Sequence, residues 1–266
     1  MRNLQGKVVV LTGASAGIGR ATALALAREG AVLHLLARRE ARLEEVCVEA
    51  RSLGGTAFPH VVDICDAQAF ARVAEEVYAE HRRVDVLINN AGVGAMKNFL
   101  ETTDDDWSWT LETNLHAVVS GIRLFLPGML ERGSGTIVNV ASLAGLMANS
   151  LPAYSASKFA VIGLSESLVL EYGGRGIEFV VVCPGVIRTE IASAGIAAGR
   201  SSAALEAKMQ EFLAKFGVPP EVVAQDIVKA VRRPRFLVLS PRHASVLHAF
   251  HSVVPDLVRS LLRRLA

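Results

Sequence analysis

Two side chains that can exchange protons stand four residues apart in the segment YSASK, which runs from Tyr154 to Lys158. Residues at positions i and i+4 share one face of a helix, so the ammonium group of Lys158 can approach the phenol of Tyr154 and favour its ionised form. A free tyrosine titrates near about 10 and is a poor base at neutral pH, so such a neighbour would make it a usable acid or base. The same pair is also common on helix surfaces, and the rest of the chain has to decide between the two interpretations.

Two more polar residues are candidates for the same reacting centre. Ser142 follows the β-branched run GTIVNVA, and a hydroxyl at the carboxyl end of a strand can hydrogen-bond a carbonyl oxygen on which negative charge develops. Asn114 lies in the segment TNLHAVVSG. Taken singly, Ser142 could be a helix cap, Asn114 a helix-interior group bonded to backbone, and Tyr154 a half-buried aromatic residue.

A glycine-rich turn follows the first β-branched run. In TGASAGIG, three glycines, Gly13, Gly17 and Gly19, lead from KVVVLT into the helical pattern RATALALAREG. Glycines allow a tight turn and let backbone N–H groups at the helix N-terminus approach a pyrophosphate, whose charge the helix dipole favours. The spacing is not G-x-G-x-x-G, so a glycine turn without a ligand is the alternative interpretation.

Seven short β-branched runs are separated by stretches long enough for helical crossovers. Several runs are apolar at successive positions, as strands covered on both faces are. We therefore predict a single-domain α/β fold of the Rossmann type, with a doubly wound, seven-stranded parallel sheet and helices on both faces. The predicted strands are residues 7–12, 31–37, 56–62, 84–89, 135–141, 177–182 and 235–240.

Length and composition agree with one domain. The chain has 266 residues, of which 51% are hydrophobic, so it can bury a large core, and no linker divides it. We place the main catalytic and cofactor-binding domain at 1–240 and a basic, amphipathic helical tail at 241–266. Within the domain, 190–220 is rich in small residues and is expected to form a helical excursion that covers the substrate.

Charge and cysteine usage exclude several classes of function. The 28 Lys and Arg nearly balance the 26 Asp and Glu, which argues against nucleic acid as a partner. Cys47, Cys65 and Cys183 lie far apart without C-x-x-C spacing, so we expect neither a disulfide framework nor a metal site. The cysteines indicate a reducing compartment, and the chain shows no long apolar run or secretory leader, so we predict a cytoplasmic location.

Several segments, taken in their order along the chain, resemble the motifs of the short-chain dehydrogenase/reductase family. The resemblance spans roughly residues 6 to 190 and includes every motif of the family's ordinary catalytic branch. The matching segments are TGASAGIG at 12–19, NNAG at 89–92, Asn114, Ser142, YSASK at 154–158 and PGVIRT at 184–189.

The resemblance implies a nicotinamide cofactor and a role for each candidate residue. It assigns Tyr154 as the acid/base and Lys158 as the group that orients the nicotinamide ribose and lowers the pKa of the tyrosine. Ser142 would donate to the carbonyl oxygen, and Asn114 would hold a water that connects Lys158 to solvent. The cofactor contacts that it implies are Gly13, Ser15, Gly17, Ile18, Gly19, Arg38, Asp63, Asn90, Tyr154, Lys158, Pro184, Gly185, Ile187 and Thr189.

The end of the second predicted strand favours NADP(H). Enzymes that prefer NAD usually place an acid there for the ribose 2′-hydroxyl, whereas this strand ends in LLARRE, with Ala37 at that position. Arg38 can offer a planar fork of donors to a 2′-phosphate, and Arg39 is close enough to add charge. The alternative is that both arginines are merely solvated. Asp63 matches the family's acid near the adenine, or else caps a helix that begins near Asp66.

We therefore expect an NADP(H)-dependent oxidoreductase that moves hydride between nicotinamide and a carbonyl or secondary alcohol. The substrate should be a lipophilic small molecule, because the predicted pocket walls at 143–151 and 190–217 are largely apolar. The alternative from another class is a catalytically silent nucleotide-binding module with the same fold. An epimerase or dehydratase of the family's extended branch would show G-x-x-G-x-x-G and a longer C-terminal substrate domain, and neither is present.

The C-terminal tail carries a local basic patch beside two apolar stripes. Its apolar residues fall on two helical faces that meet at Pro255. The first stripe is Val246, Leu247, Phe250, Val253 and Val254, and the second is Leu257, Val258, Leu261, Leu262 and Leu265. The stripes either dock on the chain's own core or on a partner subunit of the homodimer or homotetramer that the family implies, or, with Arg259, Arg263 and Arg264, make peripheral contact with an anionic membrane.

Overall fold

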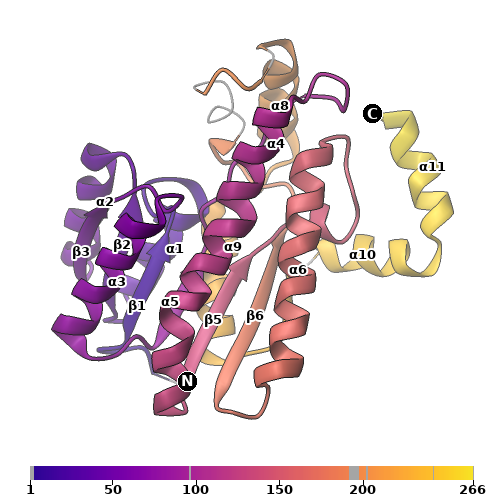
Figure 1. Cartoon of the computed structure of the whole chain (residues 1–266). Helices are drawn as coiled ribbons and strands as arrows, with labels where there is room; N and C mark the ends of the chain where they lie inside the picture. The colour runs from indigo at the N-terminus through magenta and orange to yellow at the C-terminus, as the bar shows by residue number, and fades with distance from the viewer. Residues whose placement is uncertain (1–2, 96, 192–197, 202, 242, 266) are drawn as a thin grey trace.

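A parallel sheet of seven strands forms the centre of the computed structural model, which describes residues 3–95, 97–191, 198–201, 203–241 and 243–265 (Figure 1). The order across the sheet is β3-β2-β1-β4-β5-β6-β7, which confirms the predicted doubly wound fold. The predicted strand ends differ from the observed ones by at most two residues. The strands are β1 Val8–Thr12, β2 Val32–Ala37, β3 Thr56–Val61, β4 Val86–Asn89, β5 Gly135–Val140, β6 Ile177–Pro184 and β7 Leu237–Ser240.

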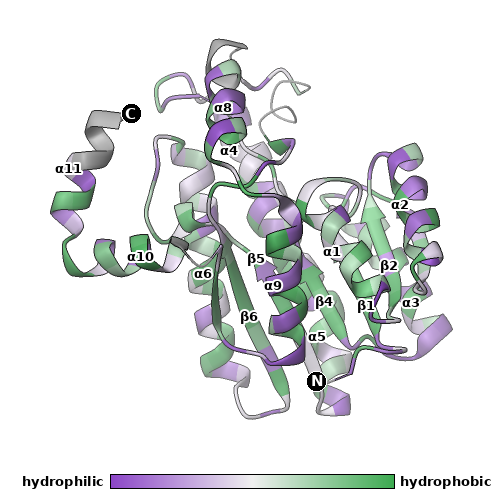
Figure 2. Cartoon of the chain, turned by 180° about the vertical axis from the view of Figure 1, so that it is seen from behind, coloured by the Kyte–Doolittle hydropathy of each residue, from purple (hydrophilic) through white to green (hydrophobic). Residues whose placement is uncertain are grey.

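Helices cover both faces of the sheet, and each face has its own apolar core (Figure 2). On one face lie α1 (Gly17–Ala27), α2 (Glu40–Ser52) and α9 (Pro220–Arg232). On the other face lie α3 (Ala67–His81), α5 (Ala117–Arg132) and α6 (Pro152–Tyr172). Strands β1, β4 and β5 are buried along their whole length, which explains why they appear in the sequence as unbroken apolar runs.

A short helix and one irregular turn interrupt the second helical layer. Helix α4 (Asp104–Leu111) runs through a π-helical turn, η1 (Glu112–His116), directly into α5. A π-helical turn adds one residue to the helical ring, is rare, and is found frequently at functional sites. This turn carries Asn114.

The excursion between β6 and β7 contains α8 (Ala203–Phe216), and residues 192–197 and 202 lie outside the described residues. Its two ends are held together at the base. Ile187 and Val218 form an isolated parallel bridge, and the backbone N–H of Arg188 donates to the carbonyl oxygen of Val218 at 3.0 Å. The excursion is therefore a closed loop that leaves the sheet after β6 and returns before α9.

The tail forms α10 (His243–Val253) and α11 (Pro255–Leu265), which stand away from the sheet in Figure 1. Ala244 and Val258 are buried, whereas much of the predicted apolar surface is not. The exposed members of the stripes are Val246, Leu247, Phe250, Val253 and Leu257. Of the alternatives that the sequence left open, the chain's own core therefore does not cover these five, and the side chains of 261–265 lie outside the described set. Among the described residues, no helix is both long and apolar enough to cross a membrane.

Candidate active site

Hydrogen bonds join the carboxyl ends of β1 and β4 beneath the glycine turn. The hydroxyl oxygen of Thr12 accepts from the backbone N–H of Asn90 at 3.0 Å and of Ala91 at 3.1 Å, and the Asn90 amide donates to the Thr12 carbonyl at 3.0 Å. The turn packs so tightly on this joint that a Cβ on Gly13 would lie 2.7 Å from the Ala91 Cα. At Gly19 a Cβ would lie 2.1 Å from the Gly13 carbonyl oxygen. Both positions require glycine, because neighbouring backbone atoms lie where a side chain would begin.

The N-terminus of α1 is suited to hold an anion. Asp66 and Thr103 cap α3 and α4 with their side chains, but Ala16 at the N-cap of α1 makes no side-chain hydrogen bond. The N–H groups of the first turn are therefore left to bind an acceptor from outside the helix. Gly17 faces Thr189, whose Cγ2 would lie 3.2 Å from a Cβ on that glycine. Thr189 therefore lies directly beside the N-terminus of α1.

The segment that carries Thr189 is fixed by backbone bonds after β6. Pro184 is the last residue of β6 and is buried. The N–H of Gly185 donates to the Ser240 carbonyl at 2.8 Å, and Ile187 is buried at the bridge to Val218. Ile18, on the other side, packs against the core from the first turn of α1.

Two arginines follow β2 and take different positions. The Arg38 guanidinium is 61% exposed and lies 3.6 Å from the Asp63 carboxylate. Arg39 instead reaches the glycine turn, where it donates to the Ser15 hydroxyl at 3.3 Å. Asp63 does not cap α3, because the Asp66 side chain does so. Arg38 and Asp63 line one end of a cavity of about 350 Å³ that extends to α4.

Arg39 also belongs to an ion cluster that joins the nucleotide end to the excursion. Its guanidinium lies 3.1 Å from the carboxylate of Glu190, and Arg42 lies 2.6 Å from the same group. The hydrogen bond from Arg39, partly opposed by burial, lowers the pKa of Glu190. The cluster ties the start of the excursion to α2.

Three of the residues predicted to react, Ser142, Tyr154 and Lys158, lie where β5 and β6 end against α6. Lys158 is 3% exposed, and its ammonium donates to the Val140 carbonyl at 3.0 Å. The same Nζ lies 5.8 Å from the centre of the Tyr154 ring. Ser142 begins the short 3₁₀ turn η2 (Leu143–Gly145), where its hydroxyl oxygen accepts from the N–H of Ala144 at 3.1 Å.

Burial dominates the electrostatics of this centre. It raises the pKa of Tyr154, and a hydrogen bond from Ser142 partly opposes the increase. Burial also lowers the pKa of Lys158 to about 8 and raises that of the nearby Cys183 thiol to about 12. In this structure the phenol is thus a neutral proton donor at physiological pH. The lowering of the tyrosine's pKa that was expected from Lys158 is not seen, because burial raises the pKa and the hydrogen bond from Ser142 is what opposes it.

Asn114 is fully buried and all its bonds are satisfied. Its Oδ1 accepts from the Val93 N–H at 2.8 Å, and its Nδ2 donates to the Val93 carbonyl and to the Ser157 hydroxyl, both at 2.9 Å. Gly92 separates it from Lys158, since a Cβ on that glycine would lie 3.4 Å from the Asn114 Oδ1 and 3.3 Å from the Lys158 Nζ. The structure therefore brings both groups to one small site without a direct bond.

The excursion covers the reacting phenol. Leu151, Tyr154 and Met209 of α8 form a small apolar cluster. The sequence placed 190–217 in the pocket wall but gave no sign of which residue meets Tyr154. Arg42, Glu190 and Met209 were likewise missed, because their contacts join segments far apart in the chain. Ser157 had a local signal, because it lies inside YSASK.

The seven-stranded parallel sheet and the glycine turn after β1 define a fold of the Rossmann type. The chain belongs to the short-chain dehydrogenase family, whose family model matches residues 7–198. A probable oxidoreductase EphD of Mycobacterium tuberculosis (strain ATCC 25618 / H37Rv) is 38% identical over 263 residues, which cover 96% of this chain and 44% of that protein. The chain thus spans less than half of that relative.

Two solved structures resemble the chain over most of its length. A short-chain dehydrogenase/reductase from Burkholderia phymatum, in complex with NAD, superposes with a TM-score of 0.87 at 29% identity and covers 97% of this chain and 96% of its own. A metagenomic short-chain oxidoreductase in complex with NADP has a TM-score of 0.73 at 32% identity, over 89% of this chain and 96% of its own. Because one binds NAD and the other NADP, the likeness supports a nicotinamide cofactor and leaves the choice to the residues of the site.

Proposed function

We propose that the chain catalyses NADP(H)-dependent reduction of the carbonyl group of a lipophilic small molecule, or the reverse oxidation of a secondary alcohol. One observation carries the proposal. The buried Ser142 and Lys158 and the half-buried Tyr154 lie together at the carboxyl edge of the sheet, the same edge as the uncapped start of α1. A silent nucleotide-binding module would have no need to bury a lysine and a tyrosine together.

Each residue has a role that follows from its position. When bound, the nicotinamide cofactor supplies or accepts the hydride. Tyr154, whose pKa burial raises, gives its proton to the carbonyl oxygen. Ser142 stabilises the negative charge that develops on that oxygen. Lys158 anchors on the Val140 carbonyl and, with Asn114, lies where a proton can be resupplied to the phenol.

The preference for NADP(H) rests on the two arginines after β2. No carboxylate ends this strand, and Arg38 is exposed with its planar fork of donors available beyond the single 3.6 Å contact to Asp63. Arg39 adds a second positive charge beside Ser15. Arg38→Ala should weaken NADPH binding at least about ten-fold more than NADH binding, because a charge-assisted hydrogen bond is lost.

Titration of both cofactors by fluorescence tests this preference, with Arg28→Ala, an exposed arginine at the end of α1, as the matched control. Equal losses for NADPH and NADH in Arg38→Ala would contradict it.

A lipophilic substrate is supported by the walls of the site. Leu151 and Met209 pack against Tyr154, and an apolar wall contributes to binding through the area that it removes from water.

Turnover separates the enzyme from the silent module. Purified chain is mixed with NADPH and a panel of ketones that range from acetone to steroid and long acyl ketones. We expect at least one ketone to give steady NADPH consumption, reduced at least about 10²-fold in Tyr154→Phe. Tyr172→Phe, at the far end of the same helix α6, is the control and should keep the rate. Consumption that is equal in Tyr154→Phe and wild type would refute the assignment.

The family suggests a homodimer or homotetramer, and the surface offers an apolar interface for one. Phe159 and Leu170 are exposed on α6, one of the helices through which we expect the subunits to meet. The exposed stripe of the tail is a second apolar surface, for which a partner subunit is the occupant we favour over an anionic membrane. The three cysteines are free, in keeping with the reducing cytoplasmic compartment that we propose.

A further inference from the structure

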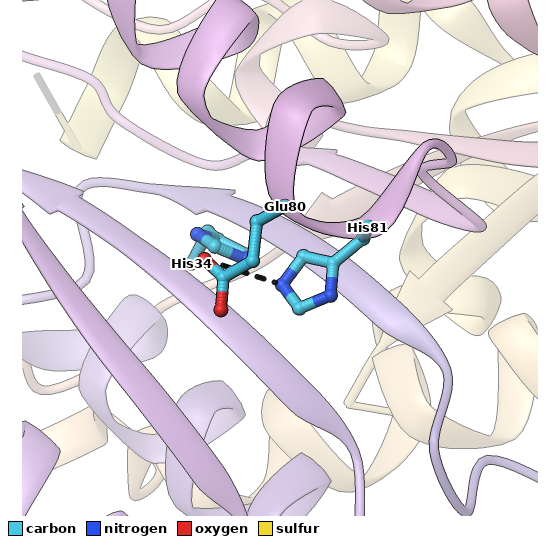
Figure 3. A group of neighbouring side chains, drawn as sticks. All are labelled: His34, Glu80 and His81. Carbon is cyan, nitrogen blue, oxygen red and sulfur yellow. Dashed lines mark ion pairs between the residues drawn. The ribbon is translucent and has the colours of Figure 1, made fainter.

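Three histidines and two glutamates gather at a place far from the reacting centre. His34 lies on β2, His60 on β3, and Glu76, Glu80 and His81 on α3. Figure 3 shows His34, Glu80 and His81. Helix α3 ends where the chain turns back toward the start of β4. The group therefore lies at the β3 side of the sheet, across β1 and β4 from the strands β5 and β6 beside Tyr154.

Two buried ring nitrogens in this group have no hydrogen-bond partner in the described part of the chain. They are Nε2 of His34 and Nε2 of His81. His34 is 1% exposed, and a buried polar atom without a partner is costly enough that it calls for an explanation. The rings of His34 and His81 lie edge to face with their centres 4.9 Å apart.

A carboxylate completes the set. Ligand atoms from His34, Glu80 and His81 all lie within 4.8 Å of one another, and the Glu80 carboxylate is 3.7 Å from Nε2 of His81. In tetrahedral zinc sites neighbouring donor atoms are separated by about 3.3 Å, from bonds of about 2.0–2.1 Å. Glu80 is exposed and His81 is half-buried, so small rotations of these two side chains can close the difference around the fixed His34.

A chain of hydrogen bonds behind His34 sets its tautomer. Its Nδ1 lies 2.9 Å from Nε2 of His60, and Nδ1 of His60 lies 3.4 Å from the Glu76 carboxylate. If His60 donates to that carboxylate, its other nitrogen accepts from His34, and Nε2 of His34 is left with a lone pair. Such a bond from the second ring nitrogen to a partner that ends in a carboxylate is the arrangement that orients metal-bound histidines.

We propose that His34, His81 and Glu80 form a binding site for a divalent transition metal, with zinc as the ion that best fits two imidazoles and one carboxylate. The remaining position is open to water. The ion would tie the end of α3 to β2, and it would have a structural effect and no part in the reaction. The sequence predicted no metal site because His34 is separated from Glu80 and His81 by more than one complete strand and helix.

Zinc binding to the full chain tests the proposal directly. The purified chain is stripped with a chelator and titrated with zinc against a coloured indicator, and the melting temperature is measured with and without zinc. We expect one zinc per chain and an increase of the melting temperature. His81→Ala and Glu80→Gln should each weaken binding at least about ten-fold and abolish that increase. Glu80 is exposed at the end of α3, so Glu80→Gln leaves the packing around the buried His34 in place, whereas His81→Ala also removes a ring that contacts it.

Matched controls remove the same groups elsewhere. Glu75→Gln changes an exposed carboxylate on the same helix, and His251→Ala changes a histidine of the tail. Both should bind zinc as the wild type does, and magnesium should not compete, because it prefers oxygen ligands. The proposal is overturned if the wild type binds no zinc at micromolar concentration. It is also overturned if His81→Ala and Glu80→Gln match their controls, which would place the zinc elsewhere, for example at the exposed Cys65.

Discussion

Lys158 carries a buried ammonium group, and its charge affects the electrostatics of the whole site. A lysine that donates to one backbone carbonyl and is 3% exposed has exchanged most of its hydration for a single hydrogen bond. Burial therefore lowers its pKa from 10.5 to about 8. Burying a lysine costs free energy, and strongly shifted pKa values of this kind are found mainly at functional sites, where the charge acts on neighbouring groups.

The lowered pKa of Lys158 predicts how stability changes with pH. Below about pH 8 both folded and unfolded chains hold the proton, and the folded state bears the full cost of burying it. Between about 8 and 10.5 the unfolded chain binds more protons than the folded one, so the free energy of unfolding rises with pH, by at most about 3 kcal/mol.

Urea unfolding at about pH 7.5 and about pH 9.5, compared between wild type and Lys158→Met, isolates this effect. The comparison is needed because the pKa of each buried thiol, Cys47 and Cys183, is raised by burial and acts in the opposite direction. We expect the wild type to gain stability relative to the variant as the pH rises. Parallel pH dependence in the two chains would show that Lys158 is not strained by burial.

At the scale of elements, the excursion over the site is held at separate points. Its base is closed by the bridge at Val218, and its start is tied to α2 through Glu190. Arg200, farther along, lies 3.0 Å from the carboxylate of Asp106, which also accepts from Lys97 at 2.7 Å. Asp106 thus joins the excursion, the loop after β4 and the first turn of α4.

Asp106 should be among the acids that contribute most to stability. Burial would raise its pKa, but hydrogen bonds from Lys97, Thr103 and Arg200 hold that pKa near about 2. Asp106→Ala removes these bonds and one half of the capping box with Thr103, and should lower the free energy of unfolding by about 2–4 kcal/mol at neutral pH.

Chemical denaturation checks this value against Asp105→Ala, an exposed acid in the same turn that should change stability by less than about 0.5 kcal/mol. The contribution of Asp106 should persist above its unfolded pKa of 3.8 and disappear as the pH falls through about 2. Equal effects of the two substitutions at neutral pH would contradict the role of Asp106.

The sequence could predict features that depend on residues close together in the chain, and it could not predict contacts between residues far apart. Buried strands such as β4 and β5 leave unbroken apolar runs, and the glycine turn has to follow a strand, so sheet, turn and reacting residues were all visible locally. The contact of Arg42 with Glu190 spans 148 residues and leaves no local pattern. The raised pKa of Tyr154 was also hidden, because it depends on how completely the fold buries the phenol.

At the scale of the whole molecule, the tail exposes an apolar surface that the rest of the chain does not cover. Phe250 and Leu257 are exposed on α10 and α11, while Ala244 anchors α10 and Val258 is buried in α11. An amphipathic helix normally buries its apolar face. We therefore propose that another subunit covers the five exposed side chains of the stripe.

Removal of the tail after Pro241 tests this interpretation. We expect light scattering at micromolar concentration to show a dimer or tetramer for the full chain and a smaller species for the truncated chain. A variant with Phe250→Ser and Leu257→Ser, which keeps both helices, should behave as the truncated chain does. If both altered chains keep the full-length mass, while the full chain sediments with anionic vesicles and they do not, the tail serves a membrane instead.

The central claim is that hydride moves between the nicotinamide and a carbonyl carbon under the control of Tyr154. The most direct measurement uses NADPH that carries deuterium at both C4 positions and whichever ketone of the panel is consumed fastest, with the product alcohol analysed by mass spectrometry and NMR. The account predicts one deuterium at the carbinol carbon, in one stereochemical configuration, from the wild type, and at least about 10²-fold slower labelling from Tyr154→Phe. Alcohol product without deuterium at that carbon, or equal labelling rates for the two chains, would contradict it.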